Sequence, residues 1–302
     1  MTYAPVTLSS APLGWFDHRF YLLSDGTLAA LRTDRDISAE HRRWLERAQK
    51  ARFPRKMPNL WNGSSKLHVL TDQGESAPIE IPMVRYPEID RFVDGRWLVV
   101  STRAAAGEKN ALILDADGRL SRSFHIGDGV EHVRCAPDGS IWIGYFDEGI
   151  FGNSIGCGGI VRFDDQGERL WSYNDGSRGS ASFIDDCYAL TLSGNDLWSC
   201  FYSDFPIVRL RDDKERRWGN DVGGAKALAV DGAYVLLAGG YGSDSRLTLV
   251  GLEQGSARTI GSYDRPELGD AALVQGRSSL LHVVNNGVWT RISVAEARSE
   301  LQ

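Results

Sequence analysis

The chain has 302 residues, of which 42% are hydrophobic and 25% charged, and its formal net charge is −6. This composition is ordinary for a soluble globular protein, and no apolar run approaches the ~18 residues that a membrane span requires. The negative charge argues against a surface devoted to nucleic acid. Residues 1–10 lack the basic start and the apolar core of a secretory signal, which favours a cytoplasmic protein.

The first predicted elements belong to a repeat that recurs along the whole chain. A strand over Tyr3–Ser9 comes first, and then an apolar strand, a turn built on Gly26 and a second apolar strand over Thr27–Thr33. Glycine supplies the positive φ that such a turn requires. The same arrangement returns at a set of glycines that we take as the anchors of the repeat: Gly26, Gly95, Gly139, Gly194, Gly232 and Gly276.

Residues 34–65 interrupt the first repeat with a helical insertion. The segment 36–53 has apolar residues at helical spacing around Trp44, Ser38 can cap its start, and Pro54 ends it. The range 32–56 carries nine Lys or Arg and four Asp or Glu, a net charge of +5, which leaves −11 for the rest of the chain. We expect this insertion to overhang one rim of the molecule, either as a lid or docking element or as a packed decoration with a solvated basic face.

Residues 131–173 contain the clearest repeat unit, in which four short strands are joined by tight turns such as Pro137-Asp138-Gly139. One four-stranded meander of about 40 residues, repeated, is typical of a β-propeller blade. The second strands lack clean polar and apolar alternation, as expected where neighbouring blades cover both faces. We expect the tryptophans on these strands to fill the space between blades: Trp97, Trp142 and Trp198.

Six anchor glycines predict a single all-β domain over residues 1–302, a six-bladed β-propeller of four-stranded antiparallel blades. The last repeat has only three strands, so Tyr3–Ser9 is expected to pair with Val288–Ile292 and close the ring. Five or seven blades are the alternatives; seven would require another meander hidden within residues 34–65.

Ionisable residues stand at or just before the starts of the innermost strands, which all open on one rim. The set comprises Asp17, His18, Asp90, Glu131, His132, Asp185, Asp186, Lys226 and Asp270. Crowded carboxylates disfavour joint ionisation unless a cation neutralises them. This pattern predicts either a Ca²⁺ or Mg²⁺ site or an acid/base pair in which Glu131 positions His132 as a general base. Ordinary wet polar residues at a channel mouth are the alternative.

The four cysteines form no Cys-x-x-Cys pair, which argues against a structural zinc site. We expect reduced thiols, mostly packed as small apolar groups. Cys157, flanked by glycines in the long segment 147–158, is also a candidate rim residue with a reactive thiol. The second long rim segment is 174–184, and long rim loops are where function tends to reside.

The segment Ala136-Pro-Asp-Gly-Ser-Ile-Trp-Ile-Gly144 resembles the repeat of streptogramin-lyase-like, NHL and gluconolactonase-type propellers, and Ser24-Asp-Gly-Thr-Leu28 and Val230-Asp-Gly232 are similar to it. For gluconolactonase-type enzymes the resemblance implies one divalent metal held at the channel mouth by acidic and amide side chains. For the lyases it implies a histidine base, for which His132 is the match. The corresponding metal ligands here would be Asp90, Glu131, Asp186 and Asp270.

The sequence contains no phosphate-binding glycine loop, no nucleophile elbow and no His-Glu-x-x-His motif. We therefore expect a binding or scaffold protein that engages a protein or a small ligand through the rim carrying the insertion, including Trp44, and the long loops. The alternative is a metal-dependent hydrolase or lyase at the channel mouth. Contact with nucleic acid through the Arg-rich helix is a weaker third hypothesis.

Overall fold

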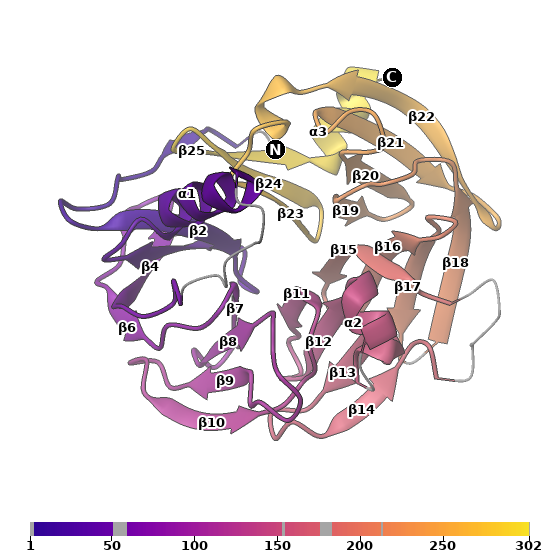
Figure 1. Cartoon of the computed structure of the whole chain (residues 1–302). Helices are drawn as coiled ribbons and strands as arrows, with labels where there is room; N and C mark the ends of the chain where they lie inside the picture. Colours follow the sequence, from indigo (N-terminus) through magenta and orange to yellow (C-terminus); the bar gives the residue numbers. More distant parts are fainter. Residues whose placement is uncertain (1–2, 51–58, 153–154, 176–182, 213, 302) are drawn as a thin grey trace.

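The computed structural model describes residues 3–50, 59–152, 155–175, 183–212 and 214–301. Antiparallel sheets dominate it and stand in a ring around a centre, as Figure 1 shows. The first sheet contains β2 (Phe16–Leu22), β3 (Leu28–Thr33) and β4 (Ser65–Thr71), and the short strands β5 (Gly74–Glu75) and β6 (Ile79–Ile81) both pair with β4. The second contains β7 (Pro87–Arg91), β8 (Trp97–Ser101), β9 (Ala111–Leu114) and β10 (Leu120–Phe124).

The third sheet contains β11 (Val130–Cys135), β12 (Ile141–Tyr145), β13 (Ile160–Phe163) and β14 (Arg169–Ser172). An eight-stranded sheet follows, in which two meanders share an edge. The first meander contains β15 (Asp186–Ser193), β16 (Asp196–Tyr202), β17 (Ile207–Arg211) and β18 (Lys214–Asn220), and the second β19 (Ala227–Asp231), β20 (Tyr234–Ala238), β21 (Arg246–Leu252) and β22 (Ser256–Asp264). A short parallel pairing of β18 with β22 joins them.

The last sheet joins the two ends of the chain. It contains β23 (Leu273–Arg277), β24 (Leu280–Asn285) and β25 (Val288–Ser293), and β1 (Val6–Thr7) pairs antiparallel with β25. The predicted pairing of Tyr3–Ser9 with Val288–Ile292 is therefore confirmed at Val6 and Thr7. The first strands of the meanders contact one another in a closed cycle that runs β2, β7, β11, β15, β19, β23 and back to β2. The fold is all-β and propeller-like, and residues far apart in sequence meet around its centre.

Helices occupy the connections and the C-terminus. The predicted helical insertion is confirmed as α1 (Ile37–Lys50), and its cap is Asp36 rather than Ser38, because the Asp36 carboxylate accepts a hydrogen bond from the Ala39 N–H at 2.8 Å. Sequence reasoning missed α2 (Asp147–Gly152), η1 (Gly156–Gly158), η2 (Pro266–Leu268) and α3 (Val294–Leu301). The first two lie within the segment 147–158 that we expected to be a loop. Residues 51–53 of the predicted helix lie outside the described residues.

The hairpin turns explain why the repeat is visible in the sequence. Aspartate side chains at these turns accept the backbone N–H two residues further on, as Asp25 does from Thr27 and Asp138 from Ser140. The glycine between them has a φ of +83° in both turns. Gly276 breaks this pattern: it lies inside β23, and the turn that follows uses Ser278 with a φ of +48°. The prediction that Gly276 is a turn residue was wrong.

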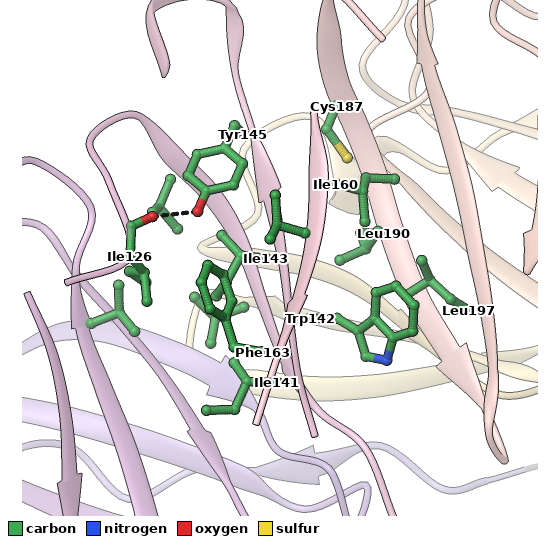
Figure 2. Close-up of a cluster of buried hydrophobic side chains, with 14 of the residues drawn as sticks. Ile126, Ile141, Trp142, Ile143, Tyr145, Ile160, Phe163, Cys187, Leu190 and Leu197 are labelled. Atoms are coloured by element: carbon green, nitrogen blue, oxygen red, sulfur yellow. Dashed lines mark hydrogen bonds between the residues drawn. The ribbon is translucent and has the colours of Figure 1, made fainter. Parts of the chain in front are cut away.

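The core lies between neighbouring sheets. Trp142 on β12 packs near Leu190 and Leu197 of the next sheet, as Figure 2 shows, and the Tyr145 hydroxyl donates a hydrogen bond back to the Ile126 carbonyl. Trp97, Trp142 and Trp198 are all buried, as predicted. Each of them also lies under an arginine, a cation–π contact at 5.0–5.8 Å made by Arg91, Arg162 and Arg209 respectively.

Candidate functional site

A cavity of about 540 Å³ lies where the first strands of the meanders begin. It is lined by residues from β2, β11, β15, β19, β20 and β23 and from the connections around them. The ionisable members of its wall are Arg19, Glu131, His132, Arg134, Asp186, Lys226 and Asp244, with Tyr188 beside them. The structure therefore brings four predicted site residues into one cavity: Glu131, His132, Asp186 and Lys226.

Irregular strand pairing presents several of these side chains. The register of β11 against β12 shifts between Val130 and His132, so Glu131 lies at a bulge. The register of β2 against β3 shifts at His18, and that of β15 against β16 shifts between Asp186 and Ala189. A bulge bends a strand and re-aims the side chain at that point. The mouth of the channel is thus built from locally irregular ends of otherwise regular strands.

Glu131 and Asp186 are the unusual groups of the cavity. Among the described residues neither carboxylate accepts a hydrogen bond or forms an ion pair. Glu131 is reached by solvent, yet the surrounding protein desolvates its carboxylate. This desolvation and the negative charges of Glu88 and Asp186 raise the pKa of Glu131 to about 7, although the positive charge of Arg19 lowers it. Desolvation and Asp147 raise the pKa of Asp186 to about 6. Within the described part of the chain, neither carboxylate therefore has a hydrogen-bond or ion-pair partner, and only Arg19 partly offsets the desolvation of Glu131.

Arg19 and Glu88 form a pair that sequence reasoning missed. Arg19 makes an ion pair with the buried residue Glu88, and the negative charge of the Glu88 carboxylate raises the pKa of Arg19. The strand β7 begins at Pro87, which puts Glu88 at its start and Asp90 near its end. Proline is well tolerated as the first residue of a strand, since it removes no ladder hydrogen bond there. This signal could have placed Glu88, rather than Asp90, at the mouth.

Asp90 is a structural residue near the other end of β7, which corrects its predicted role at the mouth. One carboxylate oxygen accepts the N–H groups of Ser24 and Arg91, both at 2.7 Å, and the other accepts the N–H of Cys135 at 2.7 Å. Ser24 follows β2 and Cys135 ends β11, so Asp90 ties three sheets together at the end of the ring opposite the mouth. It is fully buried.

His132 is buried and held by the backbone. A hydrogen bond of 3.0 Å joins its Nε2 to the Cys187 carbonyl, so Nε2 carries the proton, and burial together with Arg134 lowers its pKa to about 3. Among the described contacts no hydrogen bond joins Glu131 to His132. The geometry shows a neutral histidine that orients β11 against β15, and it gives no support to a Glu131–His132 acid/base pair.

The remaining predicted site residues lie away from the cavity wall or are engaged elsewhere. Asp17 pairs with Arg32 at 2.8 Å, and Lys226, on the wall, pairs with Asp244 at 2.8 Å. His18 packs edge-on against Trp61, and burial lowers its pKa to about 4. Asp270 is exposed in the turn before β23. Cys157 belongs to η1, forms no disulfide and has its carbonyl bonded to Asn174, whereas Cys135, Cys187 and Cys200 are buried as expected.

The metal site implied by the resemblance does not fit these residues. The Asp90 carboxylate is turned to backbone N–H groups on both oxygens, far along β7 from the mouth. Among the residues that the structure describes, no three His, Cys, Asp or Glu side chains gather closely enough to hold a metal ion. The predicted set Asp90, Glu131, Asp186 and Asp270 is therefore not brought together as a divalent-cation site.

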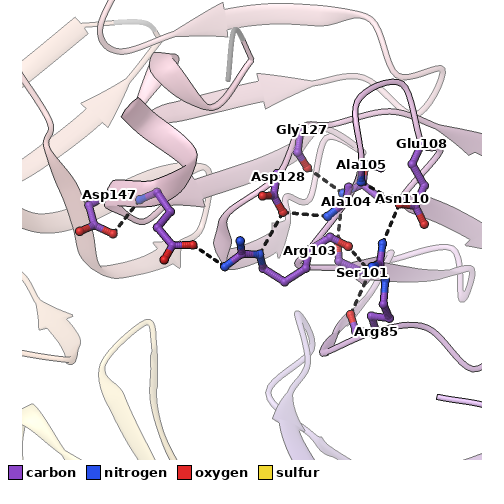
Figure 3. Close-up of polar contacts among 11 residues, drawn as sticks. Arg85, Ser101, Arg103, Ala104, Ala105, Glu108, Asn110, Gly127, Asp128 and Asp147 are labelled. Atoms are coloured by element: carbon purple, nitrogen blue, oxygen red, sulfur yellow. Dashed lines mark hydrogen bonds and ion pairs between the residues drawn. The ribbon is translucent and has the colours of Figure 1, made fainter. Parts of the chain in front are cut away.

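Two helices flank the mouth, and in Figure 1 both lie in front of the ring of sheets. Ile37 at the start of α1 packs with Leu60 and Trp61, and Trp44 stacks on His41. On the other side, Arg103 joins Asp128 at 3.1 Å and Glu148 of α2 at 2.6 Å (Figure 3). The predicted position of the insertion on this rim is thus compatible with its contacts, which join α1 to the segment 60–61 and to Tyr86 just before β7.

An aromatic cluster that sequence reasoning missed continues the cavity wall outward. The Tyr188 hydroxyl lies 3.0 Å from the Tyr241 hydroxyl, and Phe205 makes edge-on contacts with both rings and with Tyr202. Tyr241 is 65% exposed and Tyr202 44%. Tyr188 lies on β15 and Tyr202 ends β16, whereas Phe205 and Tyr241 lie in two separate connections, so no local sequence pattern predicts the cluster. Part of the segment 174–184, the second predicted rim loop, lies outside the described residues.

Comparison with known proteins supports the propeller-like fold and does not identify a function. The model of the YxzG family matches residues 160–285, less than half of the chain. Hydrazine synthase of Kuenenia stuttgartiensis is 12% identical with a TM-score of 0.54, over 92% of this chain and 83% of its own. The β-propeller domain of Cps50 (Swd1) from Myceliophteria thermophila is 13% identical with a TM-score of 0.53, over 96% of this chain and 99% of that domain.

The extracellular domain of a putative one-component system from B. thetaiotaomicron is 9% identical with a TM-score of 0.52, over 93% of this chain. This chain spans only about a third of that protein, since 34% of it is covered. No curated protein matches the chain. At these identities the likeness shows the propeller-like fold alone.

None of the described helices combines the length and the apolar character required to cross a membrane.

Proposed function

We propose that the protein is a β-propeller binding protein that takes a small ligand at the mouth of its central channel, on the rim flanked by α1 and α2. One observation carries this proposal: Glu131 and Asp186 line a cavity of about 540 Å³ and have no hydrogen-bond or ion-pair partner among the described residues. Desolvated charged groups normally find such partners, and both carboxylates are desolvated although solvent reaches Glu131. A ligand that supplies them would remove the cost of desolvating these groups.

The proposal includes the architecture that assembles the site. We take the eight-stranded sheet as two blades that share the short β18–β22 contact, which gives six blades in a single domain over residues 1–302. The closed cycle of contacts among the first strands supports this count. Ligand sites at the openings of closed β structures are common, because loops from every repeat converge there.

The alternative of a metal-dependent hydrolase or lyase has no support in the described residues, since their carboxylates do not converge as ligands. A binding role suits the exposed tyrosines beside the cavity, because aromatic side chains are common in recognition surfaces. We therefore place the ligand-contacting surface over Glu131, Asp186 and Tyr188.

The test is to fill the cavity and ask whether binding is lost. Ala272 is exposed and lines the cavity, so Ala272→Trp places a large side chain there without entering the core. Ala77, exposed in a connection of the first sheet, gives a matched control in Ala77→Trp. A library of small polar compounds is screened by saturation-transfer NMR against the unaltered protein and both variants. We expect compounds that bind the protein and A77W but not A272W. Equal binding to A272W, or no binding at all, would overturn the proposal.

A further inference from the structure

Arg134 on β11 is the most buried of the charged side chains that line the cavity. Arg134 is only 5% exposed, and it forms part of the cavity wall. A guanidinium offers five N–H donors. Among the described residues Arg134 makes one hydrogen bond, from Nη1 to the Val133 carbonyl at 2.7 Å, and it forms no ion pair. A buried arginine with most of its donors unused points to an anionic group that the protein itself does not provide.

The nearest candidate counter-ion is already committed. Asp90 offsets the effect of burial on the pKa of Arg134, but no ion pair joins the two, and the oxygens of Asp90 accept three backbone N–H groups. Asp90 also interacts with Arg277, so two guanidinium groups share one carboxylate in this part of the channel. Glu88, the other acid that acts on Arg134, is paired with Arg19. The interior of the channel therefore carries an excess of positive charge.

The mouth carries the opposite excess. The pairs Arg19–Glu88 and Lys226–Asp244 are each neutral, which leaves Glu131 and Asp186 as the acidic side chains of the outer wall that form no ion pair among the described residues. Tyr188, two residues after Asp186, and Phe146 also line the cavity, and aromatic faces favour a cationic group. The cavity thus has a cation-selective outer part and an anion-selective inner part.

The spacing of the two parts follows from the strand. β11 runs from the mouth at Val130, opposite Tyr145, to Cys135, opposite Ile141. Arg134 lies three positions after Glu131, and at a rise of about 3.3 Å per residue this places their backbone positions roughly 10 Å apart. A ligand that reaches both would carry its two charges several ångströms apart, since each charged hydrogen bond spans about 2.8 Å.

We propose that the cavity binds a zwitterion of the ω-amino carboxylate class, with its ammonium group between Glu131 and Asp186 and its carboxylate on the guanidinium of Arg134. This inference rests on the proposed function and names its ligand class. The ammonium group donates to two acceptors that otherwise have no donor, and the carboxylate accepts the unused N–H groups of the arginine. Neither end of the ligand alone satisfies both the two carboxylates at the mouth and the buried guanidinium of Arg134.

Isothermal titration calorimetry at pH 7.5 tests this with three matched probes: 5-aminopentanoate, pentylamine and pentanoate. We expect 5-aminopentanoate to bind about tenfold or more tightly than either singly charged probe, because only it satisfies both ends of the cavity. Similar affinities for 5-aminopentanoate and either single-charge probe would overturn the inference. So would the absence of binding by all three.

Two variants assign the ends. Arg134→Met keeps the bulk of the side chain and removes its charge, so the affinity for 5-aminopentanoate should fall to that for pentylamine while pentylamine binds as before. Because Arg134 is buried, the melting temperature of the Arg134→Met variant is measured as well, to show that it remains folded. Asp186→Asn is the second variant, since Asp186 is half-buried and accepts no hydrogen bond among the described residues. It should weaken both amines and leave pentanoate unchanged; an unchanged affinity for the amines would refute the placement.

The two proposals fail in different ways. If library compounds bind in a manner that A272W abolishes but the three probes show no preference for the zwitterion, the channel mouth is a binding site of another ligand class. If A272W abolishes nothing, the proposed function itself is wrong.

Discussion

The two ends of the ring are built from the same strands and differ in how their polar groups are satisfied. At the hairpin end, turn aspartates accept backbone N–H groups, and Asp90 accepts three of them from three sheets. At the mouth, Glu131 and Asp186 accept none within the described residues, and strand register slips at Glu131. The satisfied aspartates of the hairpin end therefore help to fix the relation between neighbouring sheets, in contrast to these two carboxylates at the mouth.

The largest expected effect separates the two ends directly. Asp90→Ala leaves three backbone N–H groups without their acceptor and two nearby guanidinium groups without a counter-charge, so we expect it to lower the free energy of unfolding by about 3–5 kcal/mol. Asp186→Ala, at the mouth, should change it by about 0.5 kcal/mol or less. Guanidinium denaturation at pH 7.5 measures both. Equal losses would show that the mouth is as structural as the hairpin end.

A second prediction compares two glycines of the hairpin end. A Cβ on Gly276 would lie 1.7 Å from the Leu228 carbonyl oxygen, because β23 and β19 approach closely there. We expect Gly276→Ala to destabilise the protein by about 3 kcal/mol. Gly26 has a φ of +83° and no atom within 4 Å of such a Cβ, so Gly26→Ala should cost only about 1 kcal/mol. Thermal denaturation of the two variants is the measurement, and a larger loss for G26A would contradict the close approach of the strands.

The third prediction concerns pH and the mouth. Burial raises the pKa of Glu131 from 4.5 to about 7, so between these values the folded state binds more protons than the unfolded state. The contribution of Glu131 to stability therefore falls as the pH rises from about 4.5 to 7 and is constant above that range. Glutamine does not titrate, so the melting temperature of the Glu131→Gln variant should rise relative to that of the unaltered protein as the pH increases from about 4.5 to 7.

The control for this titration is Glu168→Gln, because Glu168 is exposed on a turn at the hairpin end. Its melting temperature should follow that of the unaltered protein at every pH. If E131Q does so too, the carboxylate of Glu131 is not desolvated in the folded protein.

The smallest expected effect is at the rim network of Figure 3. Arg103 is 40% exposed and pairs with Asp128 and with Glu148 of α2. Exposed ion pairs contribute about 1 kcal/mol or less, so Arg103→Ala should lower global stability by no more than that. Hydrogen exchange of the α2 amides should nevertheless become faster, and the effect should shrink at high salt. Unchanged exchange would mean that α2 is held by its apolar contacts alone.

The sequence by itself determined the repeat and therefore the fold class. Asp-Gly turns such as Asp138-Gly139 and buried runs such as Ile141–Tyr145 act within a few residues, so their signal is local. Ring closure by Val6–Thr7 followed from the same logic, because a three-stranded last repeat leaves an edge that needs a partner. The helix α1 was predictable from its period, although its cap at Asp36 was not.

Only the tertiary structure decided which charged groups belong to the site. Residues 90 and 88 differ by two positions on one strand, yet Asp90 binds backbone N–H groups of two other sheets while Glu88 pairs with Arg19 near the mouth. The unused donors of Arg134 and the cluster around Tyr241 likewise depend on sheets that are remote in sequence. Packing against neighbouring strands sets the position of a strand along the channel. Alternation with a period of two shows on which face of the sheet a side chain lies and does not show this position.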